Sequence, residues 1–104
     1  MTYENISSSE AKSRMDTNPE AVIVDVRRPD EFVTGHIPGA INVPLADIQD
    51  GNIPPCLADK NAVYLIYCRS GVRSVTAAVT LEKMGYTRLA NFGGILDWPY
   101  EIEH

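Results

Sequence analysis

The sequence predicts an α/β protein with a small parallel sheet that is flanked by helices on both faces. Short apolar runs rich in Val and Ile lack the alternation of a half-exposed strand, which is typical of strands buried on both faces. Stretches with helical spacing lie between these runs, and strands that alternate with helices build parallel sheets. The chain has 104 residues, a length that fits one compact domain spanning residues 1–104.

Four segments have the character of strands. The strongest is AVYLIYC, in which every residue is apolar or aromatic. AVIVDV is a second buried run, AINVP is a shorter one after a turn rich in Gly and Pro, and RLANF has the character of an interior strand. In chain order the predicted strands are Ala21–Val26, Ala40–Pro44, Ala62–Cys68 and Arg88–Phe92.

Helices are predicted between these strands and near the end of the chain. Glu10 follows Ser7 by three residues, the pattern of a capping box at a helix start. In SVTAAVTLEKMG the polar and apolar residues fall mostly on opposite faces of a helix. Gly85, at its end, is predicted to be the left-handed C-cap residue that terminates it. The predicted helices are at residues 7–15, 45–50 and 74–85, with a turn and then a short terminal helix within 93–100.

The charge balance argues against several kinds of partner. Fourteen acidic and nine basic residues give a net charge of −5, so the chain repels polyanions and nucleic acid is not an expected partner. No basic amphipathic stretch and no apolar run of roughly 20 residues is present, so no membrane partner is expected either. The start, MTYENISSSEAK, lacks the features of a secretory signal, which makes the cytoplasm the expected location; an exported protein trimmed of its signal would look the same.

The chain has two cysteines, Cys56 and Cys68, and two distant histidines. This spacing is no zinc pattern, so neither a metal nor another cofactor is expected. A Cys56–Cys68 disulfide stays open from the sequence, although a reducing cytoplasm disfavours it. Cys56 has no cation near it before Lys60 and is expected to be an ordinary cysteine.

The stretch YCRSGVRS, at the end of the strongest strand, is the candidate site, because ligands bind at the carboxyl ends of strands in open parallel sheets. A loop curled around the cysteine would point N–H groups at its sulfur, and the following helix start and two arginines add positive charge. Such surroundings lower a thiol pKa from its usual ~8.5. The candidate nucleophile is Cys68, and the candidate substrate-binding residues are Arg69, Ser70, Gly71, Val72, Arg73 and Ser74.

A non-catalytic interpretation competes with this one. A cysteine that ends an apolar strand is more often a small buried side chain, and a loop of Ser, Gly and Arg is more often solvated. The position of Cys68 at a strand–loop–helix junction, beside Arg69 and Arg73, favours the catalytic interpretation.

Three segments resemble the signatures of the single-domain rhodaneses, the thiosulfate-type sulfurtransferase family. VDVRRPDEFVTGHIPGAINVP (Val24–Pro44) resembles the amino-terminal signature, YCRSGVRS (Tyr67–Ser74) the active-site loop, and LEKMGYTRLANFGGILDW (Leu81–Trp98) the carboxyl-terminal signature. They stand in the right order and together make up 47 of the 104 residues of the chain. The resemblance implies the rhodanese-like fold.

The resemblance also implies a function: transfer of sulfane sulfur from a donor such as thiosulfate, through a Cys68 persulfide, to cyanide, a thiol or a protein acceptor. Four residues separate Cys68 from Arg73, as in rhodaneses, whereas related phosphatases and arsenate reductases of this fold have one more and a wider ring. Two alternatives stay open. One is a non-catalytic or sulfur-carrying rhodanese-like interaction module, and the other, disfavoured by the loop length, is a small phosphatase or arsenate reductase.

Residues of the amino-terminal signature are expected to be mainly structural. Asp25 and Arg27 end the first strand, where they are expected to serve the scaffold rather than touch substrate, and Arg27 is expected to pair with Glu31. His36, in GHIPGA, is expected to be a structural hydrogen-bond donor rather than a base.

The two loop arginines are expected to differ. Arg69 follows the candidate nucleophile directly and should face the opening, whereas Arg73 closes the loop and should turn inward to brace it. Near the end of the chain, Trp98 and Tyr100 are expected to belong to the core or to a lid.

Overall fold

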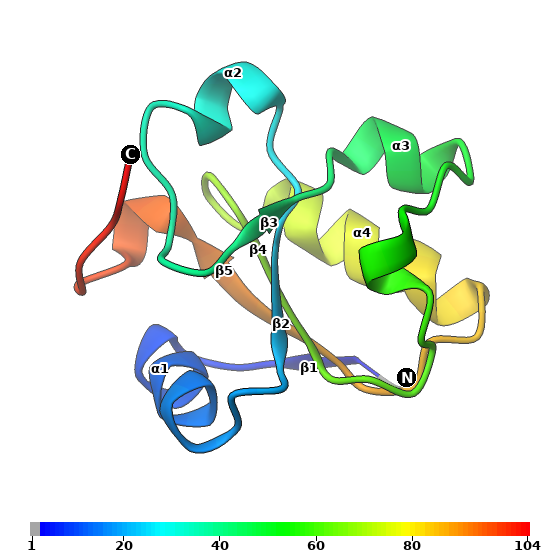
Figure 1. Ribbon diagram of the computed structural model, residues 1–104, viewed down its shortest axis with the longest axis horizontal. Coiled ribbons are helices and arrows are strands. Elements are labelled where there is room, and N and C mark those ends of the chain that lie inside the picture. The colour runs from blue at the N-terminus through cyan, green and yellow to red at the C-terminus, as the bar shows by residue number, and fades with distance from the viewer. Residues whose placement is uncertain (1–2) are drawn as a thin grey trace.

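The computed structural model describes residues 3–104. Five strands form one sheet in the order β1-β5-β4-β2-β3 (Figure 1). All neighbouring strands run parallel, so their carboxyl ends meet at one edge. The strands are β1 (Tyr3–Asn5), β2 (Val22–Asp25), β3 (Ile41–Asn42), β4 (Tyr64–Cys68) and β5 (Leu89–Gly94).

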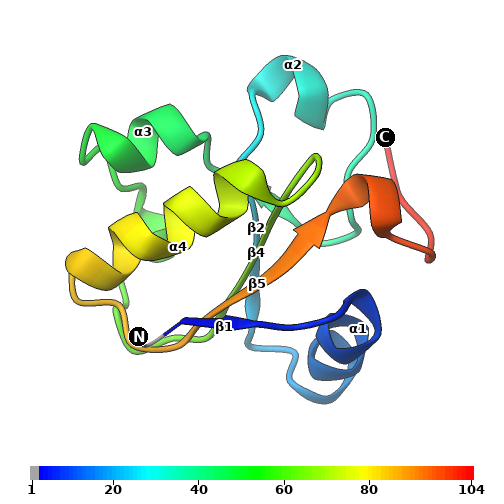
Figure 2. The same cartoon turned by 180° about the vertical axis from the view of Figure 1, so that it is seen from behind.

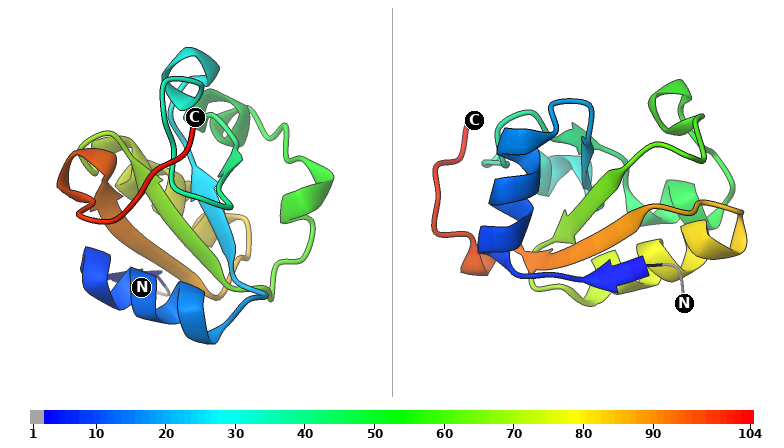
Figure 3. Two further views of the ribbon diagram at one scale, coloured as in Figure 1. Left: turned by 60° about the vertical axis from the view of Figure 1, so that its left-hand side comes forward. Right: turned by 90° about the horizontal axis from the view of Figure 1, so that it is seen from below.

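Helices cover both faces of this sheet, as Figure 3 shows. Helix α1 packs on one face, and helices α3 and α4 pack on the other. The helices are α1 (Ser8–Thr17), α2 (Pro29–Phe32), α3 (Leu45–Gln49) and α4 (Val72–Lys83), with 3-10 turns η1 (Pro55–Leu57) and η2 (Ile95–Asp97). The architecture confirms the predicted fold class. Within residues 3–104, no helix has the length and apolar character needed to cross a bilayer.

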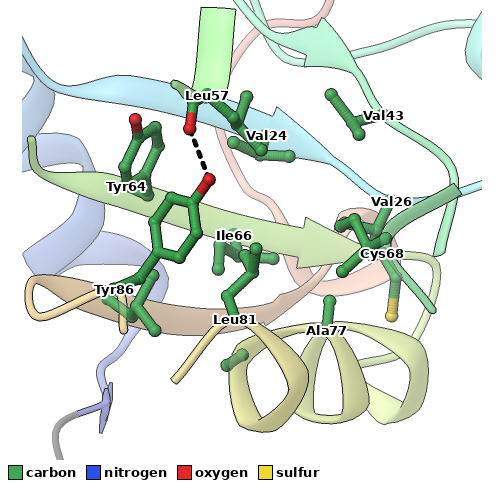
Figure 4. Close-up of a cluster of buried hydrophobic side chains, with 13 residues drawn as sticks. Val24, Val26, Val43, Leu57, Tyr64, Ile66, Cys68, Ala77, Leu81 and Tyr86 are labelled. Atoms are coloured by element: carbon green, nitrogen blue, oxygen red, sulfur yellow. Dashed lines mark hydrogen bonds between the residues drawn. The ribbon is translucent and has the colours of Figure 1, made fainter. Parts of the chain in front are cut away.

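Strand β4 lies at the centre of the core and is buried along its whole length. Tyr64, Ile66 and Cys68 point into the cluster under α3 and α4, which Figure 4 shows. Leu65 and Tyr67 point the opposite way, into the cluster under α1. Side chains alternate between the faces of a strand, so a continuous apolar run is what a strand buried on both faces requires.

Two helix ends follow the predicted chemistry. The Ser7 Oγ accepts the N–H of Glu10 at 3.1 Å, as a cap should, but the Glu10 carboxylate pairs with Arg14 instead of completing the box. At the end of α4, Gly85 has φ +100°, a left-handed conformation that glycine adopts without strain.

Several boundaries differ from the prediction. β1 and α2 were not indicated by the sequence, because a three-residue strand and a single helical turn carry no periodicity. Helix α4 begins at Val72, two residues before the predicted start, because Gly71 is its N-cap. The predicted terminal helix is a single 3-10 turn, η2, and beyond it the backbone of Glu103 bridges that of His36.

Candidate active site

Cys68 is the last residue of β4 and lies at the carboxyl edge of the sheet. Its side chain points toward the first turn of α4 (Figure 4). The residue is only 1% exposed, so the sulfur is recessed beneath the loop that joins β4 to α4. A reacting group must therefore enter from the side on which this loop opens.

The loop curls around the sulfur as its sequence predicted. The N–H of Gly71 donates to Cys68 Sγ at 3.0 Å, and the Ser74 hydroxyl lies 3.5 Å from the same sulfur. Ser74 is fully buried; its Oγ accepts the hydrogen of the Cys68 thiol and donates its own hydrogen to the carbonyl of Gly71 at 3.1 Å, so the hydroxyl is held over the sulfur. The N–H groups of the loop and this hydroxyl form a ring that fits a sulfur anion.

This environment changes the acidity of the Cys68 thiol. Burial raises its pKa, but the Ser74 hydroxyl and three backbone N–H groups of the loop lower it by more, so the pKa lies below its ordinary value. The three N–H groups belong to Ser74, Gly71 and Ser70. The loop therefore favours the thiolate, which is the nucleophilic form of cysteine.

Gly71 closes the turn that makes the ring possible. Its φ of +108° lies in the left-handed region, where a side chain would be strained. A Cβ at this position would also lie 3.3 Å from the Cα of Gly93 on β5. The turn therefore requires glycine for its conformation and for the close approach of β5.

The end of β5 packs against the backbone of the loop at Arg69 and Ser70. The pairing of β4 with β5 shifts between Ile66 and Cys68, and Cys68 then lies opposite Gly94. A Cβ on Gly94 would overlap the carbonyl oxygen of Arg69, and the same carbonyl accepts the N–H of Leu96 at 3.2 Å. The Gly-Gly pair of the carboxyl-terminal signature is therefore part of the site. The sequence signalled the pair but not its role.

Arg73 is partly buried, but its guanidinium binds α2 and, among residues 3–104, forms no hydrogen bond with the loop that it was expected to brace. Its guanidinium binds both carboxylate oxygens of Glu31, at 2.6 and 2.9 Å. This bond, above all, lowers the pKa of Glu31 to about 2. The predicted pairing of Glu31 with Arg27 is wrong. Arg27 instead binds the buried carboxylate of Asp25, with the shortest contact at 2.7 Å.

Three members of the loop are exposed, unlike Arg73. They are Arg69, Ser70 and Val72. Among residues 3–104, no carboxylate lies within ion-pair distance of Arg69. Arg69 is therefore an exposed arginine without a carboxylate partner among these residues, next to Cys68 in the sequence; its contact with an anion stays a prediction.

The remaining signature residues have structural contacts. Asp25 is fully buried, and Arg27 also donates to the carbonyl of Gly35 at 2.7 Å, which supports a scaffold role for the pair. His36 stacks on Phe32 with 3.9 Å between ring centroids. Its Nδ1 lies 3.1 Å from the Phe32 carbonyl oxygen, which fits the structural role expected of it.

The structure also places the two aromatic residues near the end of the chain and the second cysteine, for which the sequence predicts roles. Trp98 is mostly buried against Phe92, so it belongs to the core, and Tyr100 is exposed with its ring edge-on to Trp98. Cys56 and Cys68 are both free thiols, and Cys56 is exposed. The disulfide that the sequence left open is not formed.

The fold and the loop together define a class of α/β protein with a cysteine-centred anion ring at the carboxyl edge of a parallel sheet. A family model described as "Rhodanese-like domain" matches residues 7–100, so the chain belongs to the rhodanese-like domain family. This result confirms the resemblance that the three signatures indicated.

Named relatives agree with this assignment. Thiosulfate sulfurtransferase PspE of Escherichia coli (strain K12) is 39% identical over 74 residues, which cover 71% of this chain and 70% of that protein. A sulfurtransferase of Allochromatium vinosum is 38% identical over 96 residues, 89% of this chain and 85% of the relative. The crystal structure of a rhodanese-like domain protein from Staphylococcus aureus superposes with a TM-score of 0.81 at 33% identity and 96% coverage of both chains. These names support a sulfur-transfer function.

Proposed function

We propose that this protein is a thiosulfate sulfurtransferase that carries sulfur as a persulfide on Cys68. The observation that carries the proposal is the ring around Cys68 Sγ, with the Gly71 N–H at 3.0 Å and the Ser74 hydroxyl at 3.5 Å. Such a ring stabilises a thiolate before the reaction and a persulfide anion after it. Four residues separate Cys68 from Arg73, the loop length of the rhodaneses that the chain resembles, and the related phosphatases with a wider ring have one more.

In the first half-reaction the Cys68 thiolate attacks the outer sulfur of thiosulfate. A sulfur–sulfur bond forms to Cys68, the sulfur–sulfur bond of the donor breaks, and sulfite leaves with the bonding electron pair. The lowered pKa of Cys68 increases the share of thiolate, the attacking form, and YCRSGVRS contains no histidine or carboxylate to act as a base. The exposed guanidinium of Arg69 offsets the repulsion between a dianionic donor and a chain of net charge −5.

In the second half-reaction an acceptor removes the terminal sulfur. Cyanide attacks that sulfur with its carbon, the persulfide bond breaks, and thiocyanate leaves while Cys68 returns to the thiolate. A thiol acceptor reacts in the same way and leaves as a persulfide. The free thiols of Cys56 and Cys68 fit a reducing compartment such as the cytoplasm.

Mass spectrometry after incubation with thiosulfate tests the proposal directly. The Cys56→Ser variant should gain about 32 Da, one sulfur atom, and lose it on addition of cyanide. The Cys68→Ser variant should gain nothing and should fall below about a tenth of the wild-type rate of thiocyanate formation, because a hydroxyl is not ionised at neutral pH. Loading of Cys68→Ser, or turnover of an aryl phosphate in place of thiosulfate, would refute the assignment.

A further inference from the structure

A cavity lies at the amino end of the sheet, opposite the edge that holds Cys68. Its volume of about 330 Å³ is at the small end of the range for ligand pockets. Figure 2 shows the starts of β4 and β5 at the far end of the sheet from the loop between β4 and α4. We call this cavity the amino-end pocket, and its wall includes Asn18, Glu20, Asp59, Asn61, Val63 and Arg88.

The amino-end pocket is built where three strands begin. Glu20 precedes β2, Val63 precedes β4 and Arg88 precedes β5. The N–H of Val22 donates to the carbonyl of Val63 at 2.9 Å, and the N–H of Tyr64 donates to the carbonyl of Arg88 at 2.9 Å. These backbone bonds fix the three segments relative to one another.

Opposite charges line this pocket without touching. Glu20 and Asp59 carry carboxylates and Arg88 carries a guanidinium, yet none of the three forms an ion pair with any of residues 3–104. Arg88 also lines a neighbouring cavity together with Glu4, but the Glu4 carboxylate is already held by Arg14 at 2.9 and 3.2 Å. The guanidinium is therefore separated from both carboxylates of the amino-end pocket by more than the length of an ion pair.

Local hydrogen bonds hold two of the polar side chains in place. Asp59 Oδ1 accepts the N–H of Asn61 at 2.8 Å, and Asn18 Oδ1 accepts the N–H of Glu20 at 3.2 Å. Each bond uses one side-chain oxygen and leaves the second carboxylate oxygen of Asp59 and the amide N–H groups of Asn18 for a ligand. The wall of the pocket thus presents acceptors and donors in fixed positions.

We propose that the amino-end pocket binds a small zwitterion of the amino-acid class. Its carboxylate pairs with Arg88, and its ammonium group lies between Glu20 and Asp59. A molecule that carries both charges fills the gap that the charges of the protein leave between them. The half-buried side chains of Ala62 and Val63 offer an apolar surface to a small aliphatic side chain of the ligand.

Ligands with one kind of charge fit less well. A metal cation would be repelled by the guanidinium of Arg88, and residues 3–104 contain no cluster of three or more His, Cys, Asp or Glu side chains that could hold one. A simple anion would meet Arg88 but would be repelled by Glu20 and Asp59.

The pocket is separate from the sulfur site. Val63 precedes β4 and Cys68 ends it, so the two sites lie at opposite ends of one strand, about 16 Å apart along it. A ligand in the amino-end pocket should therefore neither compete with thiosulfate nor require Cys68. This inference goes beyond the proposed function and does not depend on it.

An NMR titration of the ¹⁵N-labelled protein with L-valine tests the proposal. We expect saturable shifts of backbone N–H signals at 18–20, 59–63 and 88, with a Kd of about 1 mM, the order for a small ligand held by exposed charge contacts. Two analogues isolate the charges: 3-methylbutanoate lacks the ammonium group, and 2-methylpropylamine lacks the carboxylate. Each should bind about 10-fold more weakly than L-valine.

Variants of similar size locate the charge contacts. Arg88→Gln and Asp59→Asn should each weaken binding of L-valine by about 5-fold, and asparagine keeps an acceptor for the N–H of Asn61. Lys83→Gln and Asp50→Asn are the matched controls, because both residues are exposed, and neither forms an ion pair among residues 3–104. Both controls should keep the wild-type Kd.

Several results would overturn the proposal. They are the absence of saturable shifts with L-valine, equal affinity for L-valine and either analogue, and a wild-type Kd in both pocket variants. Competition between L-valine and thiosulfate would also overturn it, because the ligand would then occupy the sulfur site. Cys68→Ser should bind L-valine as wild type does, so the pocket can be tested even if Cys68 carries no sulfur.

Discussion

Arg73 and Glu31 face each other in a two-pronged ion pair, with nitrogen–oxygen distances of 2.6 and 2.9 Å. They are 42 positions apart in the sequence, and the pair joins the first turn of α4 to the single turn of α2. Two-pronged pairs between a guanidinium and a carboxylate fix geometry as well as charge. This pair therefore joins α2 to the start of α4 and leaves Arg69 as the loop arginine without a carboxylate partner among residues 3–104.

The ion pair predicts a specific acid sensitivity. The pKa of Glu31 is lowered from 4.5 to about 2, so the carboxylate stabilises the fold above about pH 4.5, and this contribution is lost as the pH falls toward 2. Glu31→Gln should lower the free energy of unfolding by about 2 kcal/mol near neutral pH and by much less at about pH 2. Urea unfolding at both pH values measures the difference.

The neighbouring carboxylate supplies the control for this experiment. Asp30 is exposed, and its partner Arg28 is exposed as well, so Asp30→Asn should change stability little at either pH. An equal loss for Glu31→Gln at both pH values would mean that the substitution acts through packing and not through the charge of the pair.

The thiol ring predicts how Ser74 affects the acidity of Cys68. Ser74→Ala removes the hydroxyl that lies 3.5 Å from Sγ and should raise the Cys68 pKa, because this hydroxyl is one of the groups that lower it. The thiolate population at neutral pH should then fall. The pH dependence of alkylation by iodoacetamide, in a Cys56→Ser background, measures the shift. Thr76→Ala removes an exposed hydroxyl of the same helix and should leave the midpoint in place; a wild-type midpoint for Ser74→Ala would contradict the role of the ring.

Arg69 should act on the binding of a charged donor. Arg69→Ala should raise the KM for thiosulfate by roughly 5- to 30-fold, which corresponds to a partly exposed charge contact of about 1–2 kcal/mol. The effect should shrink as salt is added, because screening weakens the wild-type advantage. Arg28→Ala removes an exposed arginine already paired with Asp30 and should change KM little. An unchanged KM for Arg69→Ala at low salt would show that the anion is held elsewhere.

Gly94 should be intolerant of a side chain for reasons of space alone. A Cβ there would overlap the Arg69 carbonyl oxygen, so Gly94→Ala should displace the loop, reduce sulfur transfer more than 10-fold and lower stability by about 2 kcal/mol. Gly51→Ala is the control, because Gly51 has φ +78° and open space around it. It should lose about 1 kcal/mol of stability and keep its activity. Wild-type turnover in Gly94→Ala would show that β5 does not support the ring.

The sequence allowed the fold class and the longer elements to be predicted because their signals are local. The run Ala62–Cys68 could hardly be anything but a strand buried on both faces, and Ser7 and Gly85 mark helix ends through their own chemistry. β1 escaped prediction because three residues become a strand only through pairing with β5. α2 is likewise too short for a periodic pattern and is held by the pair between Glu31 and Arg73.

In the candidate site, too, the features that depend on neighbouring residues could be predicted, and those that depend on distant segments could not. The ring of N–H groups could be foreseen because all of its members lie within a few residues of Cys68. The roles of Glu31 and Gly94 depend on contacts with distant segments, so neither followed from the residue itself. Arg27 was given the wrong partner because the burial of Asp25, and the distant Arg73 that takes Glu31, could not be read from the sequence.

The exposure of Cys56 has a consequence for anyone who purifies the protein. Under air, an accessible thiol of this kind allows two copies to become crosslinked, while the recessed Cys68 is sheltered from such coupling. The usual remedy, an added dithiol, would also attack a persulfide on Cys68 and strip its sulfur. The same reagent would then prevent the crosslink through Cys56 and remove the sulfur from Cys68. Replacing Cys56 with serine removes the need for the reagent, so the sulfur content of freshly isolated protein can be read as it left the cell.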